Sequence, residues 1–288
     1  MNILQRLPFT AYLFLLPALL GLSLTVFVPA LQAFYLSFTN FNLLTGDAPW
    51  VGLANFDRLI KDAVFWKTVG NTLLYLLVVV PLLTVLPLML AIAVNNKLMG
   101  MSWFRAAYYV PVIISMVVAG IAWKFLYAEN GLLNQLLIGL HLSPIEWLTS
   151  PRWTIWSVMV VTVWKGLGYY MTIYLAGLQS IPADLYEAAA IDGVDGLARH
   201  WTITMPLMKP YMALVAVVSA IAATKVFEEV YVMTQGGPRN ASKTVIYYLY
   251  EKGFGTSQDL SYACAIGLVM FLAILVLSVI NLRLSVES

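Results

Sequence analysis

Six long apolar segments constrain this chain more than any other feature of its sequence. Each is long enough to cross the roughly 30 Å hydrocarbon core of a bilayer as a helix, and far longer than a barrel strand needs to be. They cover residues 11–38, 69–94, 106–127, 154–178, 207–233 and 262–284. Of the 288 residues, 61% are hydrophobic and only 10% are charged, whereas soluble domains are roughly a quarter charged. The sequence therefore predicts an all-helical integral membrane protein, with a single transmembrane domain over residues 1–288 that contacts lipid.

The composition also excludes several classes of function. The formal net charge is only +2 and the basic residues are scattered, so we expect no nucleic-acid partner. The single cysteine, Cys264, and the histidines His141 and His200 form no cluster in the sequence, so no metal site is predicted. The sequence contains no Gly-x4-Gly-Lys-Ser/Thr loop for ATP and shows no catalytic set. We therefore expect a transport subunit that binds no cofactor of its own, and not an enzyme.

The loop over residues 182–206 separates two apolar segments but carries five charged residues, so we expect it to lie in water beside the membrane. It contains, in order, Glu187-Ala188-Ala189, Asp192, Gly193, Ile203 and Pro206. The alanines predict a thin helix that a partner can approach closely, and Gly193 permits a tight turn after it. We expect Pro206 to end a second short helix before the fifth apolar segment. The loop thus predicts a helix, a turn and a helix that present acidic groups to a complementary groove.

This spacing resembles the EAA loop of ABC-importer permeases, E-A-A-x3-G-x9-I-x-L-P, with Met205 in place of the leucine. Four other stretches resemble carbohydrate permeases of the maltose and glycerol-3-phosphate type: Trp50–Phe56, Arg105–Pro111 with Trp123, Gly131 and Asn134, Ala176–Pro182, and Lys225–Thr234 with the Gly236-Gly237-Pro238 that follows. In the last of these, Glu228 stands where that family usually has aspartate. The resemblance extends from about residue 50 to about residue 254. It implies the permease subunit of an ATP-driven, binding-protein-dependent importer that moves a sugar or sugar-like solute by alternating access.

The resemblance also implies an assembly. Its members would be a second homologous permease subunit, giving a heterodimer, two copies of an ABC ATPase that use ATP and Mg²⁺, and an extracytoplasmic solute-binding protein. The location implied is the bacterial cytoplasmic (inner) membrane, with both termini and the EAA loop in the cytoplasm. The basic loop residues divide too evenly for the positive-inside rule to decide the orientation. The residues implied in ATPase coupling are Glu187, Ala188, Ala189, Asp192, Gly193, Ile203 and Pro206.

Polar groups inside the apolar segments are candidates for a substrate cavity, because such groups are costly there. In the fourth segment, four residues share one helical face at positions i, i+3, i+4 and i+7: Thr162, Lys165, Gly166 and Tyr169. Hydrogen-bonding groups beside a flat ring suit a sugar. Ser219 and Ala223 form a smaller face on the fifth segment, and the resemblance places both faces at a central cavity. The alternative is that the small residues only allow helices to pack closely.

One possible ion pair lies near the end of the fifth segment. Lys225 precedes Glu228 and Glu229 by three and four residues, so a continuous helix would bring them together. Pairing would lower the cost of placing these charges near the membrane. We therefore predict a structural or gate-stabilising pair and not a direct substrate contact.

A rival function remains open at this stage. An autonomous, ion-coupled secondary carrier would need charged groups at the middle of the membrane, and Lys165, Lys225 and Glu229 are the candidates. The outer loops predict short amphipathic helices around 53–62 and 132–140, which would either dock an external protein or cap the bundle. The sequence does not name the substrate, since a disaccharide, an oligosaccharide, a glycoside osmolyte or glycerol-3-phosphate would suit it equally.

Overall fold

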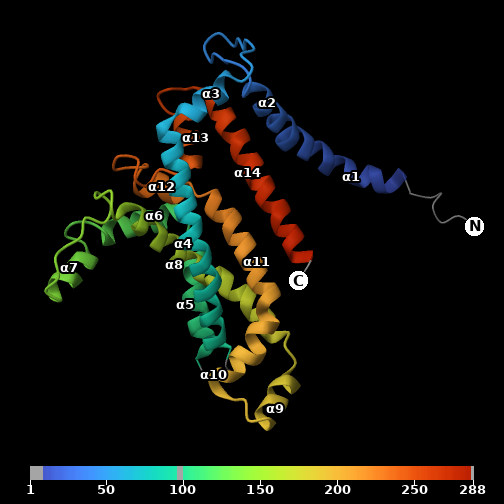
Figure 1. Ribbon diagram of the computed structural model, residues 1–288, viewed down its shortest axis with the longest axis vertical. Coiled ribbons are helices and arrows are strands. Elements are labelled where there is room, and N and C mark those ends of the chain that lie inside the picture. Colours follow the sequence, from blue (N-terminus) through green and yellow to red (C-terminus); the bar gives the residue numbers. More distant parts are fainter. Residues whose placement is uncertain (1–8, 96–99, 287–288) are drawn as a thin grey trace, which may run out of the picture. The chain divides into compact units, whose positions relative to one another are not determined.

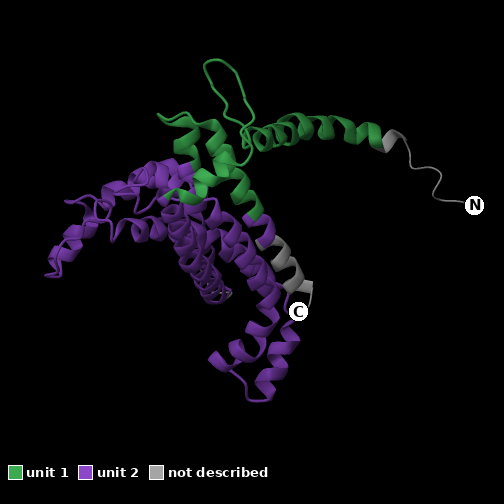
Figure 2. Ribbon diagram, turned by 45° about the horizontal axis from the view of Figure 1, so that its top comes forward, with its two compact units in different colours: residues 1–62, 249–272 green, residues 63–248, 273–288 purple. Residues whose placement is uncertain are grey.

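A computed structural model describes the backbone of residues 9–95 and 100–286, and the side chains of residues 12–95 and 100–276 (Figure 1). The predicted all-helical architecture is confirmed. Within the described residues the only β-type pairing is an isolated antiparallel bridge between Thr39 and Trp50. The chain separates into two compact units, residues 1–62 with 249–272 and residues 63–248 with 273–288 (Figure 2). A single domain over the whole chain stays a prediction.

Unit 1 begins with one long apolar helical run. It consists of α1 (Phe9–Leu22), a π-helical turn η2 (Ser23–Phe27) and α2 (Val28–Leu36). Pro29 falls in the first turn of α2, where a missing N–H is tolerated. The 25 residues from Tyr12 to Leu36 are long and apolar enough to cross a membrane. This agrees with the first predicted span.

The short helix α3 (Ala54–Lys61) connects the C-terminal end of this run to the start of α14 (Leu260–Val286). Asn55 donates hydrogen bonds to the carbonyl groups of Ser37 and Thr39 at 2.9 and 2.8 Å. Arg58 forms an ion pair with Asp259 at 2.6 Å, and its guanidinium carbon lies 4.2 Å from the centre of the Tyr262 ring. The amphipathic helix predicted around 53–62 is therefore confirmed. It serves here as a structural clamp.

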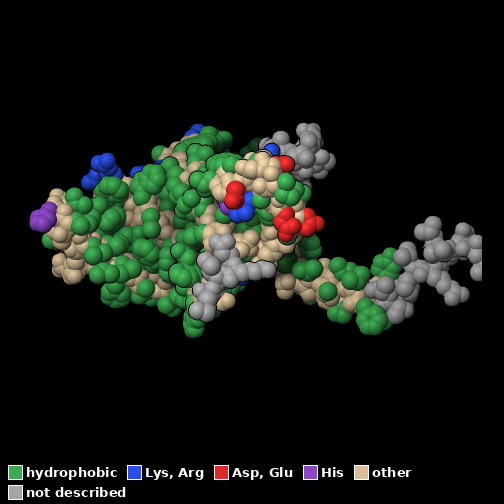
Figure 3. Space-filling model, turned by 90° about the horizontal axis from the view of Figure 1, so that it is seen from below, with side chains coloured by type: hydrophobic (Ala, Val, Ile, Leu, Met, Phe, Trp, Pro, Cys, Tyr) green, Lys and Arg blue, Asp and Glu red, His purple; other side chains and the backbone are tan. Residues whose placement is uncertain are grey.

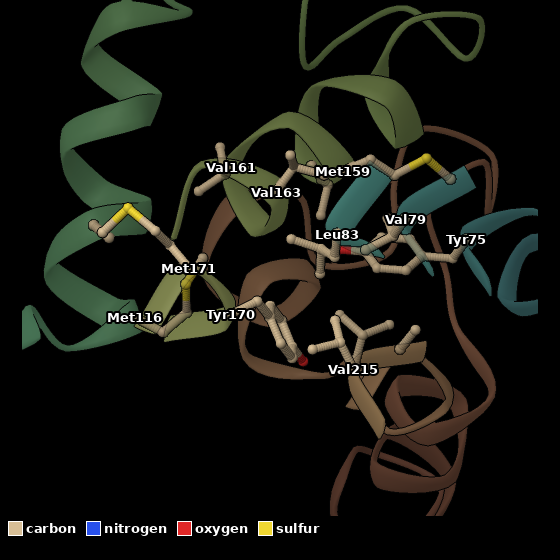
Figure 4. Packing of buried hydrophobic residues seen from close by; sticks show 14 of the residues in the cluster. Tyr75, Val79, Leu83, Met116, Met159, Val161, Val163, Tyr170, Met171 and Val215 are labelled. Carbon is tan, nitrogen blue, oxygen red and sulfur yellow. The ribbon is translucent and has the colours of Figure 1, made fainter. Parts of the chain in front are cut away.

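Unit 2 is built on three long helices: α4 (Ala63–Val94), α8 (Thr154–Gln179) and α11 (Met205–Thr224). α8 packs against both of the others, and their buried side chains make one apolar core. Figure 4 shows this core, with Leu83, Tyr170 and Val215 meeting from the three helices. A fourth helix, α5 (Met101–Ile113), crosses α8 in direct backbone contact, because a Cβ atom added at Gly168 would lie 2.1 Å from the Tyr108 carbonyl oxygen.

Two predicted spans are broken in the structure. The third was expected as one helix over 106–127, but α5 and α6 (Met116–Leu126) meet at a bend of 101°. The fifth was expected over 207–233, but α11 ends at Thr224 and α12 (Glu228–Met233) starts after a short break. The first break is not visible in hydropathy, because Ile113 and Met116 on its two sides are apolar. The second falls among charged residues, since Lys225 follows α11 and α12 begins with Glu228.

Four helices within the described residues are long and apolar enough to cross a membrane, or five if the bent pair counts as one span. Only residues up to Val276 of α14 have described side chains, and the six-span count stays a prediction. Two further short helices are α7 (Leu132–Gly139) and α13 (Val245–Phe254). α7 agrees with the second predicted loop helix.

Candidate coupling loop and central cavity

The predicted helix, turn and helix are present between α8 and α11. The first helix is α9 (Ala183–Ile191), and the second is α10 (Gly196–Arg199), which continues through the π-helical turn η3 (His200–Thr204) into α11. The prediction that Pro206 breaks the chain before the fifth span is wrong. Pro206 is the second residue of α11 and directly follows the π-helical turn η3, and the helical path runs through it without interruption.

Hydrogen bonds at the end of α9 explain the spacing between the alanines and Gly193. The Val194 N–H donates to the Ala189 carbonyl at 2.8 Å, and the Gly193 N–H donates to the Ala190 carbonyl at 3.2 Å. This pair of bonds is a Schellman motif, which requires a left-handed residue directly after the helix cap. Gly193 has φ of +77°, and an L-residue would pay about 1–2 kcal/mol there. The motif therefore favours glycine at position 193 because the backbone there must adopt a left-handed conformation.

The loop exposes both acidic and large apolar side chains. Glu187, Ala188 and Asp192 are exposed, whereas Ala189 is buried against the rest of the loop. Acidic side chains gather at this end of the molecule, which Figure 3 views directly. Three large apolar side chains are also exposed on the loop: Ile191 by 87%, Leu197 by 79% and Trp201 by 71%. Exposed apolar groups on a polar segment are typical of a protein interface. These three residues were not predicted as part of an interface. Their large apolar side chains, within a loop that carries five charged residues, could have indicated one.

A cavity of about 240 Å³ lies among the long helices of unit 2. All the residues predicted for a cavity line it: Thr162, Lys165, Gly166, Tyr169, Ser219 and Ala223. α4 supplies a further wall of the cavity, which consists of Tyr75, Val79 and Leu83 and was not predicted from the sequence. Nothing in the sequence shows which helix faces α8. The Tyr75 hydroxyl, a polar group within an apolar segment, could have indicated that α4 lines a cavity.

Polar groups from three elements meet along one side of the cavity. The hydroxyl groups of Tyr75 and Thr162 are hydrogen-bonded to each other, and the Thr162 hydroxyl donates to Glu229 Oε1 at 3.3 Å. Glu229 also lines the cavity. A carboxylate and hydroxyl groups beside the Tyr169 ring can bind a ligand rich in hydroxyl groups. Ser219 is less suited to this, because it is fully buried and its hydroxyl donates to the Ala216 carbonyl at 3.1 Å.

Lys165 has a structural task that its sequence position did not reveal. Its ammonium donates to the carbonyl oxygens of Ile114, Val112 and Pro111 at 2.8, 3.3 and 3.5 Å. These carbonyls lie at the broken end of α5, where the last turn of a helix lacks intrahelical partners and favours a cation. Lys165 therefore stabilises the bend between α5 and α6 while it forms part of the cavity wall.

Two other expectations change. A Cβ atom added at Gly166 would lie 2.7 Å from Leu83 Cδ2, so this glycine lets α4 approach α8 closely, as the packing alternative had it. The continuous helix expected from Lys225 to Glu229 is wrong, because α11 ends at Thr224. Among the described residues no ion pair involves Lys225. Glu229 points instead to Thr162 and the cavity, because the break between α11 and α12 changes the helical register.

Residues 63–285 match the family described as binding-protein-dependent transport system inner membrane component. The chain belongs to this family. It is 34% identical to the arabinooligosaccharides transport system permease protein AraP of Bacillus subtilis, over 95% of this chain and 88% of that protein. It is 35% identical to the lactose transport system permease protein LacF of Rhizobium radiobacter, over 93% of this chain and 91% of that protein.

A solved structure shows the same fold. A chain of a bacterial ABC transporter involved in the import of the acidic polysaccharide alginate superposes with a TM-score of 0.87 and 23% identity, covering 96% of this chain and 95% of that chain. A second crystal structure, of a bacterial alginate ABC transporter in complex with an alginate pentasaccharide-bound periplasmic protein, gives a TM-score of 0.84 at 24% identity, over 98% of this chain and 97% of that one. This permease is thus a multi-pass membrane protein with the fold of an ABC-importer subunit.

Proposed function

We propose that this permease carries a sugar or sugar-like solute through the cavity lined by Thr162, Tyr169 and Glu229. The observation that carries the proposal is the meeting of hydroxyl groups, a carboxylate and an aromatic ring around one cavity among the long helices of unit 2. The relatives named for arabinooligosaccharides and lactose support the same class of solute. The choice among disaccharide, oligosaccharide, glycoside and glycerol-3-phosphate is left to experiment.

Alternating access has a structural basis in the two broken helices that border the cavity. Lys165 holds the break between α5 and α6, and Glu229 follows the break between α11 and α12. Irregular backbone at membrane depth is tolerated where it lines a cavity. The breaks let one half of each helix pair tilt while the other half stays packed in the core, so that the cavity opens first to one side and then to the other.

In this proposal the coupling loop binds an ATPase subunit and transmits its ATP-driven motion to the membrane helices. Its exposed acidic and apolar side chains, among them Glu187, Asp192, Ile191 and Leu197, suit a groove on an ATPase subunit. The ATPase, present in two copies, would use ATP and Mg²⁺, because this chain carries no ATP loop of its own. A second homologous permease would complete the pathway. An extracytoplasmic binding protein would deliver the solute, and the loop and both termini would lie in the cytoplasm.

The first test is co-purification with the tagged chain in mild detergent, followed by mass spectrometry. We expect an ABC ATPase and a second permease, and we expect transport by the reconstituted complex to require ATP. Recovery of the chain alone, with solute uptake that needs no ATP and is abolished by an uncoupler, would instead establish the ion-coupled secondary carrier. A binding protein recovered with the complex would then be screened for its sugar.

A further inference from the structure

A second polar pocket, of about 460 Å³, lies in unit 2 directly behind the coupling loop. It is lined by the last turn of α4, the end of α8 and the inner side of the loop. The polar side chains that line it are Asn95, Tyr186, Arg199, His200 and Thr204. The transport cavity shares none of these residues. The pocket is therefore a separate feature that solute translocation does not explain.

The side chains of this pocket suit an anion. Among the described residues that line it there is no carboxylate, whereas a guanidinium, an imidazole, a phenol, an amide and a hydroxyl group are present. The acid beside it is Asp195, whose Oδ1 lies 3.7 Å from Arg199 Nη1. That carboxylate is largely exposed and already accepts a hydrogen bond from the Gly196 N–H at 2.7 Å. An exposed and distant partner of this kind neutralises a guanidinium only weakly.

Neighbouring contacts hold the polar groups in place. The Tyr186 hydroxyl and His200 Nδ1 each lie 3.1 Å from the Thr204 hydroxyl. The Arg199 guanidinium carbon lies 5.4 Å from the centre of the Tyr186 ring. His200 and Thr204 are the two ends of the π-helical turn η3, and turns of this kind are frequent at functional sites. The pocket is thus a fixed arrangement and not a chance gathering of mobile surface groups.

One atom of the pocket lacks the partner it needs. Arg199 Nε is buried and has no hydrogen-bond partner within the described part of the chain. Buried polar groups are nearly always hydrogen-bonded, and an exception calls for an explanation such as an absent ion. Arginine in particular matches the geometry of phosphate oxygens with two parallel hydrogen bonds. The unpartnered guanidinium nitrogen therefore indicates an anion with several oxygen atoms.

We propose that this pocket binds a phosphate group, with Arg199 as its principal ligand and His200 and Asn95 as further donors, while the Tyr186 hydroxyl is hydrogen-bonded to the Thr204 hydroxyl. The phosphate belongs either to a soluble phosphate ester or to the headgroup of an anionic phospholipid. A bound phosphate would join the end of α4 to the coupling loop, because residues of both elements of unit 2 line the pocket. Its occupancy would therefore change how freely the loop moves. This regulatory consequence rests on the proposed function, whereas the binding itself does not.

Binding is measured on the full chain in a maltoside detergent, which contains no phosphate. Inorganic phosphate is titrated against chloride at matched ionic strength, with calorimetry and the thermal unfolding midpoint as readouts. We expect saturable binding that stabilises the chain, and about tenfold or weaker affinity in Arg199→Gln, because a charge-assisted hydrogen bond is lost. Lys209→Gln is the matched control, since it removes one positive charge from an exposed position outside the pocket. Equal binding by wild type and Arg199→Gln would overturn the proposal.

A second variant covers the case in which Arg199→Gln does not fold. Asn95→Glu leaves the coupling loop intact and places a carboxylate at the exposed rim of the pocket, so we expect it to fold and to lose phosphate binding. Unchanged binding by this variant would also contradict the assignment.

The source of the phosphate is decided by repeating the titration with glycerol phosphate and with short-chain phosphatidylglycerol. Tighter, Arg199-dependent binding of the lipid identifies a headgroup site, and tighter binding of the soluble ester identifies a metabolite site. If none of the three probes binds in an Arg199-dependent way, the proposal is wrong. The ATPase rate of the complete complex, with and without the probe, then tests regulation. Failure of the complex to assemble would count against the proposed function and would leave the binding result standing.

Discussion

The coupling loop and the central cavity differ in how their residues are brought together. The turn after α9 in the loop is organised by hydrogen bonds between residues five or fewer positions apart, such as the one from Val194 to Ala189. The cavity is organised by contacts across long stretches of chain, such as the bond between Tyr75 and Thr162. The comparison teaches that a site built from local bonds can be recognised by spacing alone, whereas a site built from several helices needs the packed structure.

The largest effect is expected from Gly193→Asp in the loop. Aspartate would have to adopt the left-handed conformation at φ of +77° and would add a charge to the proposed docking face, so we expect transport to be abolished although the chain still inserts. Gly46→Asp is a matched control, because Gly46 has φ of +76°, has open space around it and lies outside the loop. Solute uptake and the amount of co-purified ATPase are the measurements. Normal uptake by Gly193→Asp would remove the loop from the coupling mechanism.

The next largest effect concerns the packing around the cavity. In Gly168→Ala the new methyl group would lie 2.1 Å from the Tyr108 carbonyl oxygen, which is backbone and cannot move aside. We expect a loss of about 3 kcal/mol in the free energy of unfolding, at the upper end for overpacking. Thermal unfolding in detergent would show it. Gly139→Ala, which meets open space at the end of α7, should change the midpoint little. Equal midpoints for the two variants would mean that α5 and α8 do not cross as described.

Lys165→Ala separates a structural role from a substrate role. It removes the ammonium from three carbonyl groups at the α5–α6 bend, and we expect a loss of about 1–3 kcal/mol in stability. A change in solute affinity or selectivity should accompany it, while the ATPase stays coupled. Lys124→Ala, an exposed lysine on α6, serves as control in the same unfolding and uptake measurements. Altered uptake without any loss of stability would show that the lysine serves the solute alone.

The smallest effect is expected from Glu229→Gln. The substitution keeps the shape of the side chain but removes a charged acceptor next to the cavity, so we expect KM for uptake to rise about tenfold, with the ATPase still coupled. Its neighbour Glu228 is exposed and does not line the cavity, so Glu228→Gln should leave KM unchanged. If the two variants behaved alike, Glu229 would have no special role in solute binding.

Much of the loop could be predicted because its physical requirements are local. Helix-forming alanines and a glycine able to adopt positive φ follow one another within a few positions. The exception is Pro206, which was expected to end a helix. A proline within the first turn of a helix and one beyond its end look the same in sequence, and only the π-helical turn before α11 decides between them.

Less of the cavity could be predicted, and the reason is geometric. Helical periodicity placed Thr162, Lys165 and Tyr169 on one face of α8, and the structure places all three at the same cavity. Periodicity within one helix says nothing about which other helix it faces, so Tyr75 and Leu83 were missed. It also assumes unbroken helices, so the pairing of Lys225 with Glu229 failed at the end of α11.

The sequence by itself determined that this chain is a helical membrane protein with a helix–turn–helix loop between its fourth and fifth apolar segments, because hydropathy and local hydrogen bonding act over short stretches of chain. Only the tertiary structure decided where the long helices break, which carbonyl groups Lys165 satisfies and which side chain Glu229 contacts. Those outcomes depend on the packing of helices that are 50 or more residues apart along the chain, as the bonds from Lys165 to Ile114 and from Thr162 to Glu229 show. No local pattern encodes such distances.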